Sequence, residues 1–389
     1  MAAARTYDIV VFGATGFTGE LTAAYLAEHA PADCRWELAG RSTAKLEAVR
    51  SRLAAINPAC ADLALLQADV ADPASIAAVA AATKVVITTV GPYLQYGEAL
   101  VAACADAGTD YVDLTGEPEF VDLMYVAHHD KAVATGARIV HACGFDSIPH
   151  DLGAYFTVQQ LPAGEKATVR GVVRSGAQFS GGTFHSAMGA MSRQGAAKKA
   201  LAARRAKEGR PEGRKVRWVQ GKPGRDSVLG YYLLPMPTID PLVVTRSAAA
   251  LDAYGPDFSY SHFAGLKTLR YTVGGALGVG SLVVAANIPP LRNALKKRIK
   301  QGEGPSESRR AKSWFTVDFV GEAAGKTVHT RVSGGDPGYS ETSKMLAESA
   351  LSLVFDDNPK TAGQVTTAVA MGDNLLARLQ LAGITFEVV

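Results

Sequence analysis

Residues 9–19 read Ile9-Val10-Val11-Phe12-Gly13-Ala14-Thr15-Gly16-Phe17-Thr18-Gly19. The apolar run predicts a buried strand, and the three glycines predict a tight turn into a helix. In such a unit Gly13 permits the turn, Gly16 lets a pyrophosphate approach the backbone, and Gly19 allows the helix to pack closely on the strand. The N–H groups at the helix N-terminus favour phosphate. We therefore predict a dinucleotide-binding loop, and a plain glycine-rich turn is the alternative.

The length and composition predict an ordered protein of two domains. The chain has 389 residues, more than one core usually holds, and 48% hydrophobic against 20% charged residues exclude a disordered chain. A formal net charge of +3 is too small to indicate nucleic-acid binding. Basic residues gather in residues 193–217 and 292–310, and we interpret both clusters as solvated helix faces.

The cysteine pattern excludes a recognisable metal motif. The four cysteines lie far apart, and neither a Ser-His-Asp arrangement nor a histidine-rich constellation is recognised, so we expect no metal. Scattered thiols are typical of a reducing compartment. The first apolar run, residues 9–13, begins too early to follow a cleavable signal peptide. We expect a cytoplasmic protein, with membrane association as an alternative.

The first part of the chain alternates short apolar runs with longer helical patterns, which predicts a parallel sheet covered by helices. The expected strands are Tyr7–Phe12, Arg35–Ala39, Leu63–Gln67, Lys84–Thr89, Tyr111–Asp113 and Arg138–Val140, with helices such as Thr18–Glu28, Thr43–Leu53 and Gly97–Ala107 between them. We predict an α/β fold with a Rossmann-type doubly wound parallel sheet over residues 1–147. A mixed α+β domain for substrate and oligomerisation, with a hairpin formed by 314–320 and 327–332, is expected over 148–355. A C-terminal helical region, 356–389, is expected to pack back on the first domain.

The residues after the second strand decide between the two nicotinamide cofactors. NAD enzymes place an acidic residue there to bind the ribose 2′-hydroxyl, whereas this chain has Gly40 followed by Arg41, with Ser42 and Lys45 within reach. A guanidinium can pair with a 2′-phosphate and stack on adenine. Glu37 lies earlier in the strand and is expected to point elsewhere. We predict NADP(H) as the cofactor.

The predicted cofactor contacts come from loops at the carboxyl ends of the strands, where a doubly wound sheet binds its ligand. They are Gly13, Thr15, Gly16, Phe17, Thr18, Gly19, Arg41, Ser42, Lys45, Thr89, Gly91, Pro92, Gly144, Phe145 and Asp146. For Asp146 and Ser147, capping of the next helix is the alternative. We interpret Cys143 as a structural thiol, and His150 and Asp151 as structural or surface groups.

Hydride transfer also needs a donor that supplies a proton to the substrate. Tyr93 and Tyr96 follow the fourth strand, and His185 lies at a predicted helix start in the second domain. These three are the candidate catalytic residues. The alternative for the two tyrosines is that they only line the crevice wall.

Several of these motifs together resemble the saccharopine dehydrogenase-like oxidoreductases, and among them the actinobacterial trans-acting enoyl reductases. The motifs are Phe12–Gly19, Ala39–Arg41, Gly91–Tyr93, Cys143–Pro149, Gly302–Ser306 and Gly334–Tyr339. The resemblance runs over nearly the whole chain. It implies an NADPH-dependent reductase that works beside polyketide synthases in lipid biosynthesis and reduces an enoyl thioester. Because a shared fold does not fix the reaction, an imine or opine-type reductase and a non-catalytic, lipid-associated NADP(H)-binding protein stay open as alternatives.

Residues 271–291 contain no charged side chain, and basic residues follow at 292–300. The length would span a bilayer, but four glycines and Pro289-Pro290 weaken a helix. Three interpretations stay open: a buried or subunit-interface element, a segment on an anionic membrane surface, and a true membrane helix. The expected partner is an acyl or other small-molecule substrate, free or bound to a carrier protein, and no nucleic acid. Peripheral membrane contact and a homodimer are further alternatives.

Overall fold

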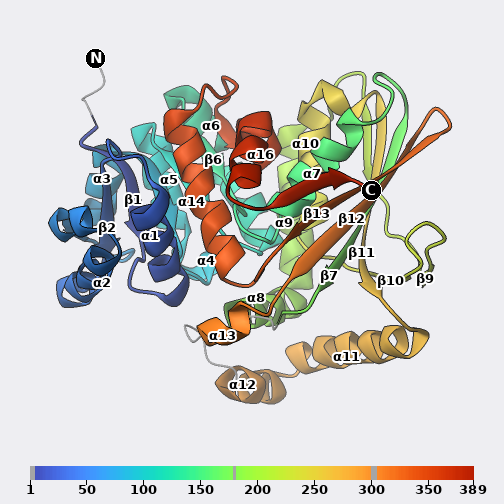
Figure 1. The fold of residues 1–389 in the computed structure, drawn as a ribbon, viewed down its shortest axis with the longest axis horizontal. Coiled ribbons are helices and arrows are strands. Elements are labelled where there is room, and N and C mark those ends of the chain that lie inside the picture. Colours follow the sequence, from blue (N-terminus) through green and yellow to red (C-terminus); the bar gives the residue numbers. More distant parts are fainter. Residues whose placement is uncertain (1–4, 178–180, 299–304) are drawn as a thin grey trace.

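A parallel sheet of seven strands forms the first half of the fold in the computed structural model, which describes residues 5–177, 181–298 and 305–389 (Figure 1). The strand order is β14-β6-β5-β4-β1-β2-β3. The strands are β1 (Tyr7–Phe12), β2 (Trp36–Gly40), β3 (Leu65–Gln67), β4 (Thr83–Thr88), β5 (Asp110–Asp113), β6 (Arg138–Val140) and β14 (Gly363–Val365). The chain order reverses between β1 and β4, so a ligand crevice is expected at their carboxyl ends. The predicted Rossmann-type sheet is confirmed.

Helices cover this sheet because its central strands are apolar on both faces. Residues 9–12 of β1 and 85–87 of β4 are all buried, as in a sheet shielded on two sides. The helices of this half are α1 (Phe17–His29), α2 (Thr43–Ile56), α3 (Pro73–Ala82), α4 (Tyr93–Tyr96), α5 (Glu98–Ala107) and α6 (Pro118–Thr135). The predicted helices and strands of this region agree with these bounds to within a few residues.

A mixed sheet forms the second half of the fold, with the order β15-β13-β12-β7-β11-β10-β9 and β8 beside β11. Its strands are β7 (Ala167–Ser175), β8 (Lys215–Trp218), β9 (Gly224–Arg225), β10 (Tyr232–Pro235), β11 (Asp257–Leu266), β12 (Phe315–Ala323), β13 (Lys326–Gly334) and β15 (Thr385–Val388). The predicted hairpin is β12 and β13, which pair antiparallel. Ala324 and Gly325 both have positive φ, as a two-residue hairpin turn that follows the strand twist requires.

The chain crosses between the two sheets more than once. Helix α7 (Ile148–Gln159) leads from β6 to the second sheet, and α14 (Ser340–Phe355) then returns to pack beside α1 against the first sheet (Figure 1). Strand β14 joins the first sheet beside β6, whereas β15 joins the second beside β13. Helices α15 (Thr367–Ala370) and α16 (Gly372–Leu381) lie between these strands in the chain. The two sheets are therefore not two consecutive segments of sequence, although boundaries at residues 147 and 355 were expected.

Most basic residues of the cluster at 193–217 are exposed, in agreement with the predicted solvated face, but Arg204 is buried and three of these residues pair with acidic side chains of α6. The cluster begins in α9 (Gln194–Glu208), which follows α8 (Gly181–Ser192) and packs along α6. Arg193 pairs with Glu119 at 2.6 Å, Arg204 with Asp122 at 2.5 Å and Lys207 with Asp130 at 2.8 Å. The acidic partners lie 74 to 82 residues away in the sequence for the first two pairs, so a local charge pattern does not reveal them.

The uncharged stretch forms a peripheral helix, α11 (Leu269–Asn287), followed by α12 (Pro289–Arg298). Figure 1 draws both at the margin of the molecule, and α11 contacts α8 and the neighbouring strands β10 and β11. Among the described residues, α11 is the one helix long and apolar enough to cross a membrane, and 17% of its most apolar window is buried. A fully buried core element is therefore wrong for this segment. The short helix α13 (Glu307–Arg310) comes next among the described residues. Residues 302–304 of the Gly302–Ser306 motif lie outside the described part of the chain.

The half-buried Glu37 in β2 yields a prediction about the pH dependence of stability. Burial raises the pKa of its carboxyl to about 7, against an opposing backbone hydrogen bond at Ala64. The folded state therefore holds a proton that the unfolded state releases near pH 4.5, and stability is lost as the pH rises from about 4.5 to 7. Glu37→Gln should remove this loss and stabilise the protein at pH 8 by about 1 kcal/mol, after allowance for partial exposure.

Thermal unfolding at pH 5 and pH 8 measures this effect. The exposed Glu47 on α2 provides the control, since Glu47→Gln should leave the pH dependence of the melting temperature unchanged. An equal loss of stability between pH 5 and pH 8 in wild type and Glu37→Gln would contradict the prediction.

Candidate functional site

The turn after β1 has the geometry of a phosphate-binding loop. Gly13 has φ +90°, and a Cβ there would come within 2.7 Å of the Val90 side chain. A Cβ at Gly19 would overlap the carbonyl oxygen of Gly13, so α1 could not approach the strand so closely with any other residue. A Cβ at Gly16 would meet only that carbonyl, at 3.4 Å. The protein itself therefore leaves open space in front of Gly16 and the first turn of α1, where a pyrophosphate would sit.

The remaining predicted residues of this loop divide into exposed and packed positions. Thr15 and Gly16 are exposed at the turn, and the backbone oxygen of Thr18 accepts a hydrogen bond from the Ser343 hydroxyl at 3.4 Å. The Phe17 ring packs edge-on against Tyr339, with 4.8 Å between centroids. Tyr339 and Ser343 belong to the start of α14, so residues more than 300 positions away complete the wall of the loop.

The end of β2 presents a cation where an NAD enzyme would have an acid. Arg41 is exposed, and the structure gives no ion pair for its guanidinium within the described ranges. Ser42 caps α2 by accepting a hydrogen bond from the Lys45 backbone N–H at 3.4 Å, so its hydroxyl has a structural role as well. Lys45 is exposed one turn further on. This arrangement can accept a 2′-phosphate and offers no carboxylate to repel it.

The turn after β4 is held against the phosphate loop and against the next strand. The Thr89 hydroxyl donates to the carbonyl oxygen of Gly13 at 3.2 Å. Gly91 and Pro92 follow, joined by a cis peptide, and lead into α4. The buried Glu117 accepts hydrogen bonds from the backbone N–H groups of Tyr93 and Leu94 at 3.2 and 3.0 Å. Sequence reasoning did not assign Glu117 a role, although a carboxylate at a helix N-terminus is a recognisable pattern.

The loop after β6 carries concentrated backbone strain. In the described part of the chain, the non-glycine residues with positive φ are Ala142, Ser147 and Ala324, and the first two bracket the predicted contacts Gly144, Phe145 and Asp146. Such conformations cost about 1–3 kcal/mol each and cluster at functional sites. Ser147 begins α7 without a side-chain cap, so the capping alternative does not apply to it.

Buried polar contacts fix this strained loop in place. Asp113, at the end of β5, accepts hydrogen bonds from the Ala142 N–H at 2.8 Å and lies 2.7 Å from Nδ1 of His141. The Phe145 N–H donates to the Thr342 hydroxyl of α14 at 3.1 Å. Burial raises the pKa of Cys143, whose thiol donates to the Val140 carbonyl oxygen at 3.4 Å. Cys143 is thus a buried structural thiol and not an activated nucleophile.

The three candidate proton donors occupy different environments. Tyr93 is buried, and its hydroxyl donates to the Thr88 carbonyl oxygen at 3.1 Å. Burial, reinforced by the charge of Asp113, raises its pKa well above the ordinary value. Tyr96 is 44% exposed at the end of α4. His185 is partly buried in α8, and the hydroxyl of the adjacent Ser186 donates to Glu117 at 2.9 Å. Glu117 therefore connects the helix that carries His185 to the helix that carries both tyrosines.

Asp146 has a perturbed carboxyl group at the same edge of the sheet. Burial raises its pKa to about 6, and the negative charge of Asp240 adds to this shift while His150 opposes it. A Cβ on Gly116, in the loop after β5, would lie 3.1 Å from an Asp146 carboxyl oxygen. His150 and Asp151 are both buried, so their interpretation as surface groups is wrong, whereas the structural one agrees with the burial.

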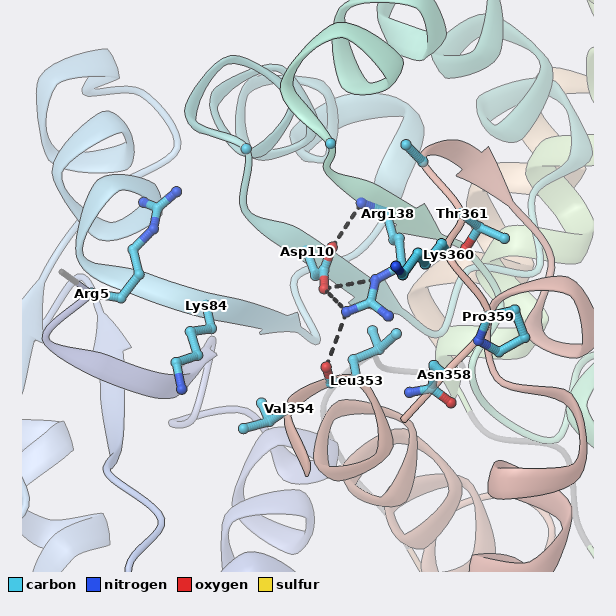
Figure 2. Close-up of a pocket in the computed structure, with 13 residues that line it drawn as sticks. Arg5, Lys84, Asp110, Arg138, Leu353, Val354, Asn358, Pro359, Lys360 and Thr361 are labelled. Atoms are coloured by element: carbon cyan, nitrogen blue, oxygen red, sulfur yellow. Dashed lines mark hydrogen bonds and ion pairs between the residues drawn. The ribbon is translucent and has the colours of Figure 1, made fainter. Parts of the chain in front are cut away.

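A hollow elsewhere on the first sheet is not part of this site. Figure 2 shows residues that line it, and they include the starts of β4, β5 and β6. It therefore lies at the amino ends of the strands, opposite the phosphate loop. Two basic side chains in its lining already form ion pairs. Arg138 Nε donates to Asp110 Oδ2 at 2.9 Å, and Lys84 Nζ lies 2.8 Å from Asp8 Oδ1. Arg5 in the same hollow donates to the backbone oxygens of Ala80 and Ala81.

The exposed guanidinium of Arg41 yields a prediction about cofactor preference. Arg41→Ala should weaken NADPH binding by about 10- to 100-fold, because one or two charge-assisted hydrogen bonds to the 2′-phosphate are lost. NADH affinity should change much less, since that cofactor lacks the phosphate. Dissociation constants from nicotinamide fluorescence titration measure both effects. Arg52→Ala is the matched control, because Arg52 lies on α2 but pairs with Glu20. Equal losses for NADPH and NADH would contradict the assignment.

Comparisons with known proteins agree with this geometry. Residues 9–140 match the family model described as the saccharopine dehydrogenase NADP binding domain. A Mycobacterium tuberculosis protein provisionally named a trans-acting enoyl reductase is 40% identical over 99% of this chain and 98% of its own length. The trans-acting enoyl reductase of Mycobacterium bovis is 37% identical over 98% of this chain and 97% of its own, and that of Mycobacterium ulcerans is 35% identical over 98% of each.

The fold has a solved counterpart. Saccharopine dehydrogenase (L-Glu forming) from Saccharomyces cerevisiae superposes with a TM-score of 0.58, covering 98% of this chain and 100% of that one, at 13% identity. The likeness at this identity shows a shared fold alone. The near-complete match to the mycobacterial relatives and the matched NADP binding domain show more: the chain belongs to the trans-acting enoyl reductase family of saccharopine dehydrogenase-like, NADP-dependent oxidoreductases.

Proposed function

We propose that the chain uses NADPH to reduce the carbon–carbon double bond of an enoyl thioester. The observation that carries this proposal is the match of 35% to 40% identity, over nearly the full length, to relatives named trans-acting enoyl reductases. The nicotinamide supplies a hydride to the β-carbon, and the resulting enolate takes up one proton at the α-carbon. The protein's own part is to orient the acyl group, exclude water and deliver that proton.

We propose His185 as the proton donor. It lies on α8, which the Ser186–Glu117 hydrogen bond of 2.9 Å fastens to the turn that follows β4. That turn stands at the carboxyl end of the sheet, where the nicotinamide of a doubly wound fold lies. Imidazole is the side chain most often used as a general acid or base in enzymes, whereas the Tyr93 hydroxyl is buried and already donates to a backbone carbonyl. Tyr93 then acts as a positioning residue, and the exposed Tyr96 is the second choice as donor.

The proposed cofactor contacts follow from the same loops. The backbone of Gly13, Thr15, Gly16, Phe17, Thr18 and Gly19 would hold the pyrophosphate, and Arg41, Ser42 and Lys45 would surround the 2′-phosphate. Thr89, Gly91, Pro92, Gly144, Phe145 and Asp146 would flank the nicotinamide half. Three of these loops, those after β1, β4 and β6, meet through the Thr89–Gly13 and Phe145–Thr342 hydrogen bonds and the start of α14.

A kinetic experiment tests both the reaction and the donor. The wild-type chain should oxidise NADPH with a long-chain enoyl thioester, presented as a pantetheine thioester or on a carrier domain. His185→Gln should lower kcat by about 100-fold or more, since general acid catalysis typically contributes 10²–10⁴-fold, and should leave the Kd for NADPH unchanged. Tyr96→Phe is the matched variant at the alternative donor and should lower kcat only slightly.

Other outcomes would contradict the proposal in distinguishable ways. Turnover of cyclic imines or amino-acid–keto-acid adducts, but not of enoyl thioesters, would favour the imine or opine-type alternative, whose fold-level precedent is the yeast saccharopine dehydrogenase. Tight NADPH binding without turnover of either class would favour a non-catalytic NADP(H)-binding protein. A large loss in Tyr96→Phe and none in His185→Gln would move the proton donor to Tyr96.

We also propose that α11 rests on an anionic lipid surface. Leu269, Val273, Leu277 and Val284 are 52% to 68% exposed, and their spacing places them within an arc of about 80° on one helix face. Ile288 and Leu291 extend this apolar stripe past the end of the helix. From Phe258 to Gly302 the chain has no acidic residue, but it has seven lysines and arginines. Such a net charge would oppose a homodimer through this face, and it complements anionic headgroups.

Vesicle flotation tests this surface. The chain should bind phosphatidylcholine vesicles that contain phosphatidylglycerol, and binding should fall at high salt and without the anionic lipid. The double variant Leu277→Asp, Val284→Asp should lose binding while it keeps wild-type NADPH affinity. Leu381→Asp is the matched control, because Leu381 is 90% exposed on a different helix. Vesicle binding that survives the double variant, or a monomer–dimer equilibrium that the variant abolishes, would overturn the lipid-surface proposal.

A further inference from the structure

Three titratable side chains from distant parts of the sequence converge inside the second half of the fold. His150 lies in the first turn of α7, Asp240 at the start of α10 (Asp240–Ala250), and His262 in β11. Their side chains are 1% to 5% exposed. His150 Nδ1 lies 2.9 Å from Asp240 Oδ1, and His262 Nε2 lies 3.5 Å from Asp240 Oδ2. One nitrogen or oxygen from each residue lies within 4.8 Å of the others.

The inner atoms of this cluster are close together but are not hydrogen bonded. In the described part of the chain, both ring nitrogens of His150, Oδ1 of Asp240 and Nε2 of His262 have no hydrogen-bond partner, although all of them are buried. The short N···O distances thus lack the alignment of a hydrogen bond. An unsatisfied buried polar group typically costs about 1–3 kcal/mol, so several in one place indicate a partner that all of them share.

The outer atoms of the same residues do have partners. The Tyr260 hydroxyl lies 3.1 Å from Nδ1 of His262, and the Thr238 hydroxyl donates to Oδ2 of Asp240. These bonds orient the His262 ring and the Asp240 carboxylate. Nε2 of His262 and Oδ1 of Asp240 are left without a partner, whereas Oδ2 of Asp240 accepts from Thr238 and also lies 3.5 Å from His262 Nε2. Metal-binding histidines and carboxylates commonly have such supporting hydrogen bonds on the side away from the ion.

The distances fit a divalent cation better than a water molecule. Two ligand atoms each about 2.1 Å from a zinc ion, at an angle of 90–110°, lie about 3.0–3.4 Å apart. The two measured separations of 2.9 and 3.5 Å are close to this range. A water molecule would stand about 2.8 Å from each partner and would need wider spacing.

We propose that His150, Asp240 and His262 bind one first-row divalent cation, and zinc and cobalt are the two probes used in the test. Two imidazoles and one carboxylate suit zinc and its neighbours, whereas magnesium and calcium prefer oxygen ligands alone. The ion would fasten α7 to α10 and β11, and so hold the strained loop before α7, because His150 lies only four residues after Asp146. The carboxyl of Asp146 is close enough to Asp240 for the two charges to interact, so a cation would also relieve their repulsion.

Metal analysis of the full chain tests the site without an activity assay. Chain expressed with added zinc should retain about one equivalent of metal after gel filtration, as measured by elemental mass spectrometry. After chelation it should take up one equivalent of Zn²⁺, with a rise in the midpoint of thermal unfolding. Co²⁺ should give visible absorption bands of a nitrogen–oxygen site without thiolate charge transfer. Asp240→Asn and His262→Gln should each weaken Zn²⁺ binding by at least about 100-fold.

A matched histidine–aspartate pair provides the control. His329 Nε2 bonds Asp318 at 2.8 Å with good geometry on β13 and β12, so His329→Gln should keep the full metal content. Wild-type chain that takes up neither Zn²⁺ nor Co²⁺ would overturn the proposal even if the variants do not fold. Metal that Asp240→Asn and His262→Gln retain at wild-type affinity would overturn it as well, because the ion would then lie elsewhere.

Discussion

The candidate active site depends on how closely α1 can approach the end of β1. At Gly19 a side chain would overlap the Gly13 carbonyl oxygen, and at Gly13 it would press on Val90 in the neighbouring strand end. These two contacts bring the helix N-terminus over the carboxyl end of the sheet and turn its unpaired N–H groups toward the crevice. The end of β2 and the loop after β4, which precede or carry other proposed cofactor contacts, bond directly to this point: the Gly13 N–H donates to the Ala39 carbonyl oxygen, and the Gly13 carbonyl oxygen accepts from the Thr89 hydroxyl.

Two buried carboxylates, those of Asp113 and Glu117, connect the other loops of the candidate site by hydrogen bonds. Asp113 binds the backbone at Thr115 and Ala142, and it thereby joins the loops after β5 and β6. Glu117 binds the first turn of α4 and the hydroxyl of Ser186, and it thereby joins the cofactor half to α8. Each carboxylate is buried, so loss of its partners would leave an unpaired charge in a medium of low polarity. We infer that Asp113 keeps the strained backbone at Ala142 in place through its bond to the Ala142 N–H.

Local sequence patterns predicted the strands of the first sheet from β1 to β6. The features that the sequence did not predict, such as β14 and the buried ion pairs, depend on contacts between residues that are distant in the sequence. The glycine triplet and the apolar runs predicted β1 to β6 because each signal lies within about 20 residues. The three residues of β14 carry no such signal; they become a strand only because they meet β6. The acidic partners of Arg193 and Arg204 lie 74 and 82 residues away in the sequence, and His150 is likewise far from Asp240 and His262. No spacing rule identifies them, since the fold alone brings them together.

The chain crosses between the two sheets several times, and these crossings restrict how the two halves of the fold can move apart. Helix α7 leaves the first sheet for the second, α14 returns to line both the phosphate loop and the Phe145 loop, and β14 and β15 each extend a different sheet. A single hinge between consecutive domains could not open such a molecule without breaking several of these contacts. We propose that an acyl chain would approach along the margin formed by α8, α11 and α12. That region carries both the proposed donor His185 and the apolar stripe, so a lipid surface there would deliver substrate on the side where the proton is needed.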